Sequence, residues 1–195
     1  ELFYEPKHAM ETVDETVVKA ADEFCEGYKS YLDEAKIERE SVEFFVKEAE
    51  KRGYTEFDNT KKYNAGDKVY YNNRGKAIIL CVMGKKDISE GVKISAAHID
   101  SPRLDLKPNP LYEDSSLAYF KTHYYGGIKK YQWTAIPLAL HGVVVKANGE
   151  SVKVTIGEDD NDPQFVVTDL LPHLAQDQMK QTMSEGIKGE QLNIL

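Results

Sequence analysis

The sequence has little cysteine and no long hydrophobic run. Its two cysteines, Cys25 and Cys81, show none of the paired spacings of metal-binding or redox motifs, so we expect two buried, reduced thiols. The longest apolar run covers residues 77–83 and is far shorter than the roughly 20 residues of a membrane-spanning helix. The first residues also lack the basic and then apolar pattern of an export signal. These absences predict a cytoplasmic protein with no membrane partner.

The sequence also has no excess of basic residues. The chain carries 25 lysines and arginines against 33 aspartates and glutamates, which gives a net charge of -8. A nucleic-acid backbone repels such a chain unless a basic patch compensates, and the cluster at Lys129 and Lys130 is small. We therefore expect no nucleic-acid partner. The 195 residues, 41% of them hydrophobic, suffice for one substantial domain or two small ones.

The first half of the chain predicts two helices and a hairpin. Apolar side chains recur at a three-to-four spacing in residues 11–32 and again in residues 35–52, where Gly53 is placed to end the second helix. From residue 68 to residue 83 the period changes to that of strands. The turn-rich tetrapeptide NNRG at residues 72–75 divides this stretch, which predicts a β-hairpin.

The next stretch, KISAAHIDSPRLDLKP at residues 93–108, carries the chemistry of the sequence. Residues 92–97 predict a short buried strand that delivers His98 and Asp100 to a turn. Side chains two residues apart in a strand share a face, so the Asp100 carboxylate is placed to fix the imidazole tautomer while the other ring nitrogen binds a metal. His-X-Asp alone is a weak signal. Taken alone, it is better explained by a hydrogen bond that merely closes the strand end.

The second half predicts a mainly β module that follows the His98 strand. Asn148 and Gly149 form a tight turn between its last two strands, and residues 170–189 predict a helix. Asp159 and Asp160 are expected in a solvated loop. The predicted strands cover residues 117–124, 137–146 and 151–156.

Three longer stretches, in this order and spacing, are far more specific than any single motif. They are SAAHIDSPRLDLKPNPLYE from Ser95, HYYGGIKKYQWTAIPLALHGVV from His123 and DLLPHLAQDQM from Asp169. Together they resemble the M18 family of zinc-type aminopeptidases, which includes aspartyl aminopeptidases and vacuolar aminopeptidase I. The resemblance extends over residues 11–195 and is strongest to a bacterial branch of the family.

The resemblance implies an α/β fold in two parts. Residues 1–106 would begin a zinc-peptidase-like α/β sandwich, the proteolytic domain. Residues 107–195 would form an inserted, mainly β dimerisation domain that is incomplete at its C-terminal end. The family likeness further implies a homo-oligomer, in which dimers assemble into a tetrahedral dodecamer whose enclosed interior admits only short peptides as substrates.

The resemblance also assigns site residues. His98 matches a metal-ligand histidine, and Asp100 matches the aspartate that orients it. Residues 125–142 match a segment that reaches the active site of the adjoining subunit. The substrate-binding candidates in and beside this segment are Tyr131, Trp133, Lys129 and His123. For Lys129 an exposed loop, and for His123 and His141 a hydrogen-bonded interface histidine, remain as alternatives. Tyr131 replaces a histidine of aspartyl aminopeptidases, and this leaves a preference for acidic N-terminal residues open.

The family's remaining catalytic groups are not found in this sequence. Enzymes of this type bind two divalent ions, here expected to be zinc with cobalt or manganese as alternatives, and use a Glu-Glu pair that the chain lacks. One histidine cannot hold a hydrolytic zinc, which needs three or more protein ligands. We therefore expect a metal-dependent aminopeptidase that is active only with a further C-terminal portion. A non-catalytic self-association fragment, or a dinuclear peptidase of another family, remains as an alternative.

Overall fold

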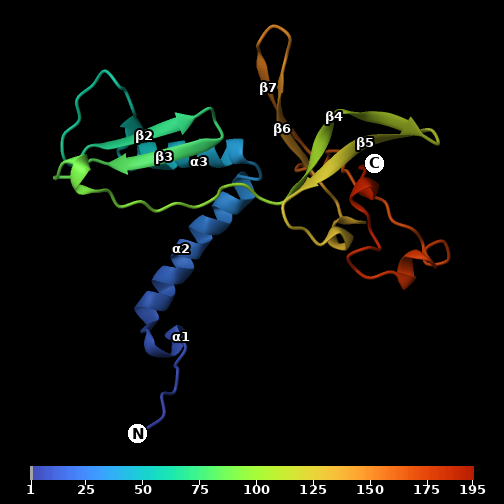
Figure 1. The fold of residues 1–195 in the computed structure, drawn as a ribbon, viewed down its shortest axis with the longest axis horizontal. Helices are drawn as coiled ribbons and strands as arrows, with labels where there is room; N and C mark the ends of the chain where they lie inside the picture. Colours follow the sequence, from blue (N-terminus) through green and yellow to red (C-terminus); the bar gives the residue numbers. More distant parts are fainter. Residues whose placement is uncertain (1) are drawn as a thin grey trace. The chain divides into compact units, whose positions relative to one another are not determined.

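The computed structural model describes residues 2–195 and divides the chain into two compact units, Glu1–Ile99 and Asp100–Leu195 (Figure 1). The domain boundary expected after residue 106 lies inside strand β4 (Arg103–Asp114). The assignment of a proteolytic and a dimerisation domain stays a prediction. Within residues 2–195, no helix is both long and apolar enough to cross a membrane.

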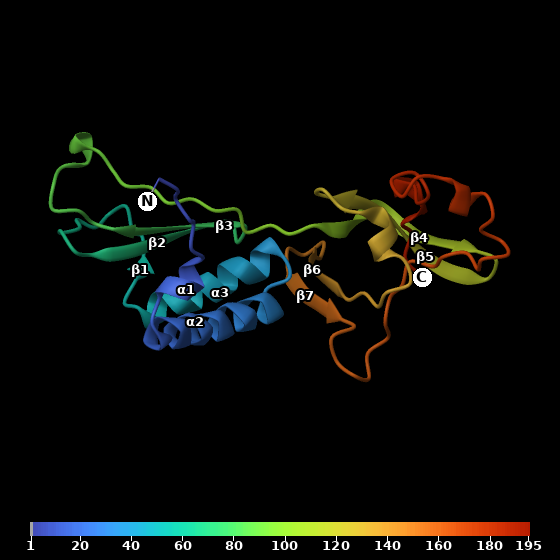
Figure 2. The same ribbon diagram turned by 90° about the horizontal axis from the view of Figure 1, so that it is seen from below.

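The first unit packs helices against a small sheet. Strand β1 runs parallel to β2, β2 runs antiparallel to β3, and α3 contacts both β2 and β3 (Figure 2). The predicted helices and hairpin are thereby confirmed. The elements are α1 (Ala9–Thr12), α2 (Glu15–Glu34), α3 (Glu38–Lys51), β1 (Thr55–Glu56), β2 (Lys68–Asn73) and β3 (Ala77–Val82).

Local signals in the sequence explain where these helices begin and end. The Asp14 carboxylate accepts hydrogen bonds from the backbone N–H groups of Thr16 and Val17, so it caps α2. The Thr16 side chain and these backbone donors lower the pKa of Asp14. Helix α3 is followed by Gly53, whose φ of 80° is the left-handed conformation that glycine adopts at helix ends.

The core of the first unit lies where α3 covers the sheet. Val42 and Ala49 of α3 and Val69 of β2 are buried there. Tyr70 of β2 is also buried, and its hydroxyl donates to Glu50 at 2.9 Å. Burial, reinforced by the Glu50 carboxylate, raises the pKa of Tyr70. The unit is thus held by one apolar face of α3 and a satisfied polar contact at its margin.

The second unit consists of two antiparallel ribbons and irregular segments. Its buried core combines Val167, Ile187, Leu192 and Ile194, all from segments beyond the ribbons. Thr122 of β5 is buried and donates its hydroxyl to the Leu192 carbonyl. The mainly β character predicted for this half is confirmed. The strands are β4 (Arg103–Asp114) paired with β5 (Leu117–Tyr125), and β6 (Leu140–Val145) paired with β7 (Ser151–Ile156).

Short 3-10 turns complete the second unit. The first, η2 (Lys130–Trp133), follows β5, and η3 (Gln178–Lys180) and η4 (Gly189–Gln191) lie near the end of the chain. The prediction of a helix over residues 170–189 is wrong, because only turns and these 3-10 segments form there. Thr182 instead makes local side-chain hydrogen bonds to Ser184 and Glu185, which compete with helical backbone bonding.

Two further expectations are wrong. Residues 92–97 form no strand, and no other segment in the described part of the chain offers them a ladder of backbone partners. Without a neighbour, Ile94 stays 82% exposed. Cys25 and Cys81 are exposed rather than buried. Cys25 lies on α2, which buries none of its residues, and Cys81 lies on β3, where no residue is buried.

Candidate functional site

Asp100 is the predicted site residue whose surroundings the structure defines best. The hydroxyl of Tyr125 donates a hydrogen bond to Asp100 Oδ2 at 2.7 Å. Asp100 is the first residue of the second unit and is half-buried. A hydrogen bond of this length to a carboxylate is a strong one and favours this orientation of the carboxylate. The acidic member of the His-X-Asp motif is therefore held by a residue 25 positions further along the chain.

The pairing of β4 with β5 brings Tyr125 to this position. Tyr125 stands opposite Arg103 in the ladder, and the Arg103 guanidinium carbon lies 4.3 Å from the centroid of the Tyr125 ring. Arg103 is fixed in turn, because its Nε donates to Asp105 Oδ1 at 2.8 Å and its guanidinium donates to the Ser101 carbonyl at 3.2 Å. A cation stacked on a ring and tied at two other points limits the motion of that ring.

The turn after Tyr125 approaches the chain just beyond Asp100. Gly126 has a φ of 83°, and a Cβ there would lie 3.5 Å from the Pro102 Cα. The positive φ, rather than the available space, is what favours glycine at this position. Gly127 has neither a positive φ nor a close neighbour. The Tyr-Gly-Gly sequence thus ends β5 beside the segment that carries Asp100.

His98 lies in the other unit, in an exposed segment outside any strand. Imidazole and carboxylate groups are the donors that zinc takes from proteins, so the chemistry of the His-X-Asp pair fits that metal. Their number does not suffice, because in residues 2–195 no three His, Cys, Asp or Glu side chains are grouped to hold an ion. The described residues therefore do not form a complete metal site.

The two aromatic substrate candidates have a structural place. Tyr131 and Trp133, both in η2, pack against the buried cluster that contains Val167 and Ile194. This packing accounts for the positions of both rings. Their role in substrate binding is a separate matter and stays a prediction. Lys129 precedes η2 as its N-terminal cap residue and is exposed.

His123 lies in β5, opposite Asp105 of β4. It contributes to an electrostatic group with Glu190 and Lys107. The Lys107 ammonium, 2.8 Å from the Glu190 carboxylate, is the main cause that lowers the pKa of Glu190, and His123 adds a smaller effect in the same direction. His123 is thus beside a charge pair on β4 and η4.

Other polar groups of the second unit have local partners. His141 of β6 meets Glu158, with Nε2 and Oε1 2.7 Å apart, so the predicted hydrogen bond of this histidine is present. Asp159 and Asp160 lie exposed in the turn after β7, as expected. Asp162 closes this turn by accepting a hydrogen bond from the Gly157 backbone at 2.8 Å.

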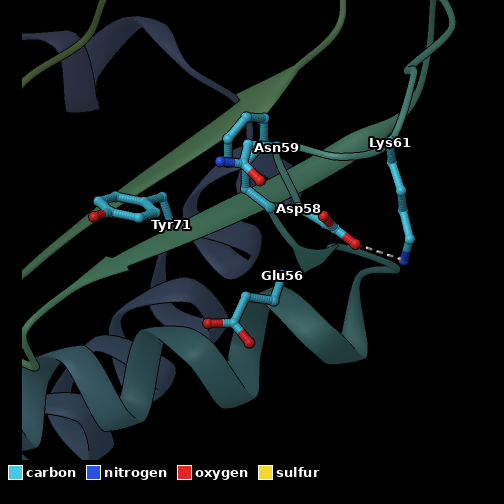
Figure 3. Close-up of a pocket in the computed structure, with 6 residues that line it drawn as sticks. Glu56, Asp58, Asn59, Lys61 and Tyr71 are labelled. Carbon is cyan, nitrogen blue, oxygen red and sulfur yellow. Dashed lines mark ion pairs between the residues drawn. The ribbon is translucent and has the colours of Figure 1, made fainter.

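An open pocket of about 530 Å³ lies in the first unit, beside β1 and β2. Figure 3 shows the Asp58 carboxylate turned toward the Lys61 ammonium, 3.7 Å away. Hydrogen bonds from Thr60, and the nearby Lys61, lower the pKa of Asp58. The lining residues include no histidine or cysteine and none of the predicted site residues. They are Glu56, Phe57, Asp58, Asn59, Lys61 and Tyr71.

Sequence reasoning missed Tyr125 as a partner of Asp100. The available signal was its place directly before two glycines, in a segment already expected to approach an active site. That signal does not name the atom that the hydroxyl contacts. The contact depends on the β4–β5 register, which shifts at an irregularity between Leu106 and Leu111.

Comparisons with known proteins cover the whole chain. The model of the aminopeptidase I zinc metalloprotease (M18) family matches residues 31–195. A probable M18 family aminopeptidase 1 from Clostridium acetobutylicum is 50% identical over 199 residues, which cover 100% of this chain and 43% of the relative. The crystal structure of an M18 aminopeptidase from Thermotoga maritima has a TM-score of 0.87 and 40% identity, covering 98% of this chain and 41% of that one. Aminopeptidase I from Clostridium acetobutylicum has a TM-score of 0.83 and 44% identity, covering 100% of this chain and 43% of that one.

The chain spans less than half the length of these relatives. Its likeness to M18 aminopeptidases confirms the expected α/β fold, the beginning of a zinc-peptidase-like sandwich with a mainly β insertion. The family model covers most of the sequence, and identity with a relative reaches 50% over the whole chain. The chain therefore belongs to the aminopeptidase I zinc metalloprotease (M18) family.

Proposed function

We propose that this chain supplies part of the active site of a cytoplasmic metal-dependent aminopeptidase that removes N-terminal residues from short peptides. His98 contributes one metal ligand, and Asp100 hydrogen-bonds the other ring nitrogen of that histidine. The remaining ligands and the general base belong to a further C-terminal portion. The observation that carries this proposal is the defined position of the Asp100 carboxylate in a chain of a zinc metalloprotease family.

The role of orienting a ligand histidine suits Asp100 because another residue already contacts its carboxylate. The Tyr125 hydroxyl occupies Oδ2. Under this proposal, the carboxylate selects one tautomer of the imidazole that it orients. The other imidazole nitrogen of His98 would then be available to hold a metal ion.

Two divalent ions, zinc in the first place and cobalt or manganese as alternatives, would polarise the scissile carbonyl and lower the pKa of a bound water. The protein's own residues bind and orient the peptide. We assign Tyr131, Trp133, Lys129 and His123 to the substrate side of an adjoining subunit's site. This assignment requires a homo-oligomer, which we propose to be dimers assembled into a dodecamer.

The test compares the full-length protein with its His98→Ala variant and with the 195-residue chain. We expect bound zinc and hydrolysis of aminoacyl chromogenic substrates only in the full-length protein. Zinc content is measured by elemental analysis after dialysis. An unchanged zinc content in His98→Ala, or peptidase activity of the 195-residue chain alone, would contradict the assignment.

A second function, non-catalytic self-association, is favoured by one observation. Several large apolar side chains between η2 and η4 are exposed, among them Leu171 at 60%, Leu174 at 66% and Met183 at 66%. Exposed apolar groups of this kind mark surfaces that another protein covers. Light scattering on the 195-residue chain tests this function, because a concentration-dependent dimer without zinc binding supports it and a monomer opposes it.

A further inference from the structure

We infer that Lys130 is an anion-binding residue that receives a carboxylate of the peptide substrate. This inference rests on the proposed function, which assigns Tyr131 and Trp133 of the same turn, η2, to substrate binding. It adds the residue that recognises the negative charge of the peptide. The contacts that support it lie within the second unit, Asp100–Leu195.

The first support is the place of the Lys130 ammonium. Its nitrogen lies 5.9 Å from the centroid of the Tyr124 ring, within the range of a cation–π contact. The Tyr124 ring also packs closely on η4, because a Cβ at Gly189 would lie only 2.8 Å from Tyr124 Cε1. A side chain at position 189 would therefore displace the ring. The contact with η4 gives the ring, and with it the ammonium, a defined place.

The second support is that no acidic group neutralises Lys130. Within residues 2–195 its ammonium makes no ion pair and no hydrogen bond, although the chain carries 33 acidic residues against 25 basic ones. Lys107 differs in this respect, because its ammonium lies 2.8 Å from the carboxylate of Glu190 in η4. Lys130 is also half-buried, so its charge is less hydrated than that of a fully exposed lysine. It is therefore available to an anion from outside the unit.

A carboxylate is the anion that suits the proposed function. Every peptide carries one at its C-terminus whatever its sequence, and acidic residues carry others. A lysine ammonium binds a carboxylate through charge-assisted hydrogen bonds, which are stronger than bonds between neutral groups. Lys129 and Lys188, which adjoin Lys130 and Gly189 in the sequence, also make no ion pair in the described part of the chain. In a protein of net charge -8, this basic group favours the approach of an anion.

Lys121 provides a matched comparison in the same unit. Its ammonium also lies over a tyrosine ring, 5.2 Å from the centroid of Tyr112. Tyr112 pairs with Tyr119 toward the turn end of the β4–β5 ribbon, and Lys121 itself is exposed. Lys121→Met and Lys130→Met therefore remove the same charge from the same kind of contact, but only Lys130→Met changes η2.

The experiment measures dissociation constants of the full-length protein by isothermal titration. The probe is a trialanine whose first peptide bond is reduced to CH2–NH, so it resists hydrolysis, prepared as the free acid and as the C-terminal amide. We expect the wild type to bind the acid roughly fivefold more tightly than the amide, the upper range for an ion pair open to solvent. A third probe, the amide with aspartate as its first residue, distinguishes a side-chain carboxylate from the C-terminal one.

Lys130→Met should abolish the preference for the carboxylate-bearing probe and leave binding of the neutral amide unchanged, which a merely structural role would not do. Lys121→Met should keep the wild-type preference, and Lys130→Arg should retain most of it because the charge remains. A wild type that binds all three probes equally, or an unaltered preference in Lys130→Met, overturns the inference. Because the probes are not hydrolysed, this result is separate from the proposed function, which fails by an unchanged zinc content in His98→Ala.

Discussion

The two members of the His-X-Asp motif lie on different sides of the boundary between the units. His98 is exposed in a segment that is neither helix nor strand. Asp100, two residues later, opens the second unit and accepts a hydrogen bond from Tyr125. The comparison shows that a short motif does not fix both of its side chains by local structure. Here the β4–β5 ribbon defines the carboxylate, while the imidazole lies in a stretch without regular backbone pairing.

Of the substitutions that test this comparison, the replacement of the His98 imidazole should have the largest effect. His98→Ala removes the proposed ligand itself, so we expect zinc affinity of the full-length protein to fall by more than about 100-fold, beyond the effect of an outer-shell change. His141→Ala is the control, because that imidazole already pairs with Glu158. Isothermal titration of the metal-free proteins measures both. Equal losses in the two variants would remove the special role of His98.

Asp100→Asn should have the next largest effect. An amide keeps the shape of the carboxylate but lacks its charge, so we expect a 10–100-fold loss of zinc affinity or turnover. Asp114→Asn, at the exposed end of β4, should leave both unchanged. Metal titration and steady-state kinetics of the full-length protein check this. A loss smaller than about threefold would mean that Asp100 does not orient a metal ligand.

The contact between Tyr125 and Asp100 also depends on the turn at Gly126, which directly follows Tyr125. Gly126→Ala places a Cβ on a residue with φ of 83°, which costs on the order of 1 kcal/mol or more in free energy of unfolding. Gly127→Ala, where φ is not positive and no atom lies within 4 Å of the added Cβ, should cost much less. Urea unfolding of the 195-residue chain measures both. Equal costs would show that the turn does not constrain this end of β5.

The smallest expected effect concerns the ion pair between Lys107 and Glu190. The pair lowers the pKa of Glu190 below that of the unfolded chain, so its contribution is present at neutral pH and is lost as the pH falls through the folded value. Lys107→Met should therefore lower stability slightly at about pH 7 and not at about pH 3. Urea titrations at the two pH values test the sign. A difference that grows on acidification would contradict the assignment.

The parts of the fold that the sequence predicts well are those with local causes. The β2–β3 turn places Arg74 and Gly75 at φ 59° and 67°, and the Lys76 N–H donates to the Asn73 carbonyl at 3.1 Å across these two residues, as in a tight turn with positive φ at both central positions. Asn148 and Gly149 lie in the connection between β6 and β7, residues 146–150, where Gly149 has a positive φ of 85°. Helix α3 ends before Gly53 for an equally local reason.

The parts that the sequence predicts poorly depend on distant partners. Residues 92–97 have the composition of a strand, but a strand also needs neighbouring backbone, which the described residues do not offer. Strand β4 went unpredicted because Pro108 and Pro110 interrupt its hydrogen-bonding pattern, and its register shifts in the same region. The contact between Tyr125 and Asp100 follows from that register and has no local signature.

The most direct test of the central claim is an anomalous-scattering map of the full-length protein crystallised with zinc. The account predicts a zinc ion about 2.0–2.1 Å from one His98 nitrogen. It also predicts the Asp100 carboxylate at hydrogen-bonding distance from the other nitrogen, with the Tyr125 hydroxyl still on Oδ2. A zinc ion bound elsewhere while His98 contacts only protein atoms, or an Asp100 carboxylate turned away from both partners, would contradict it.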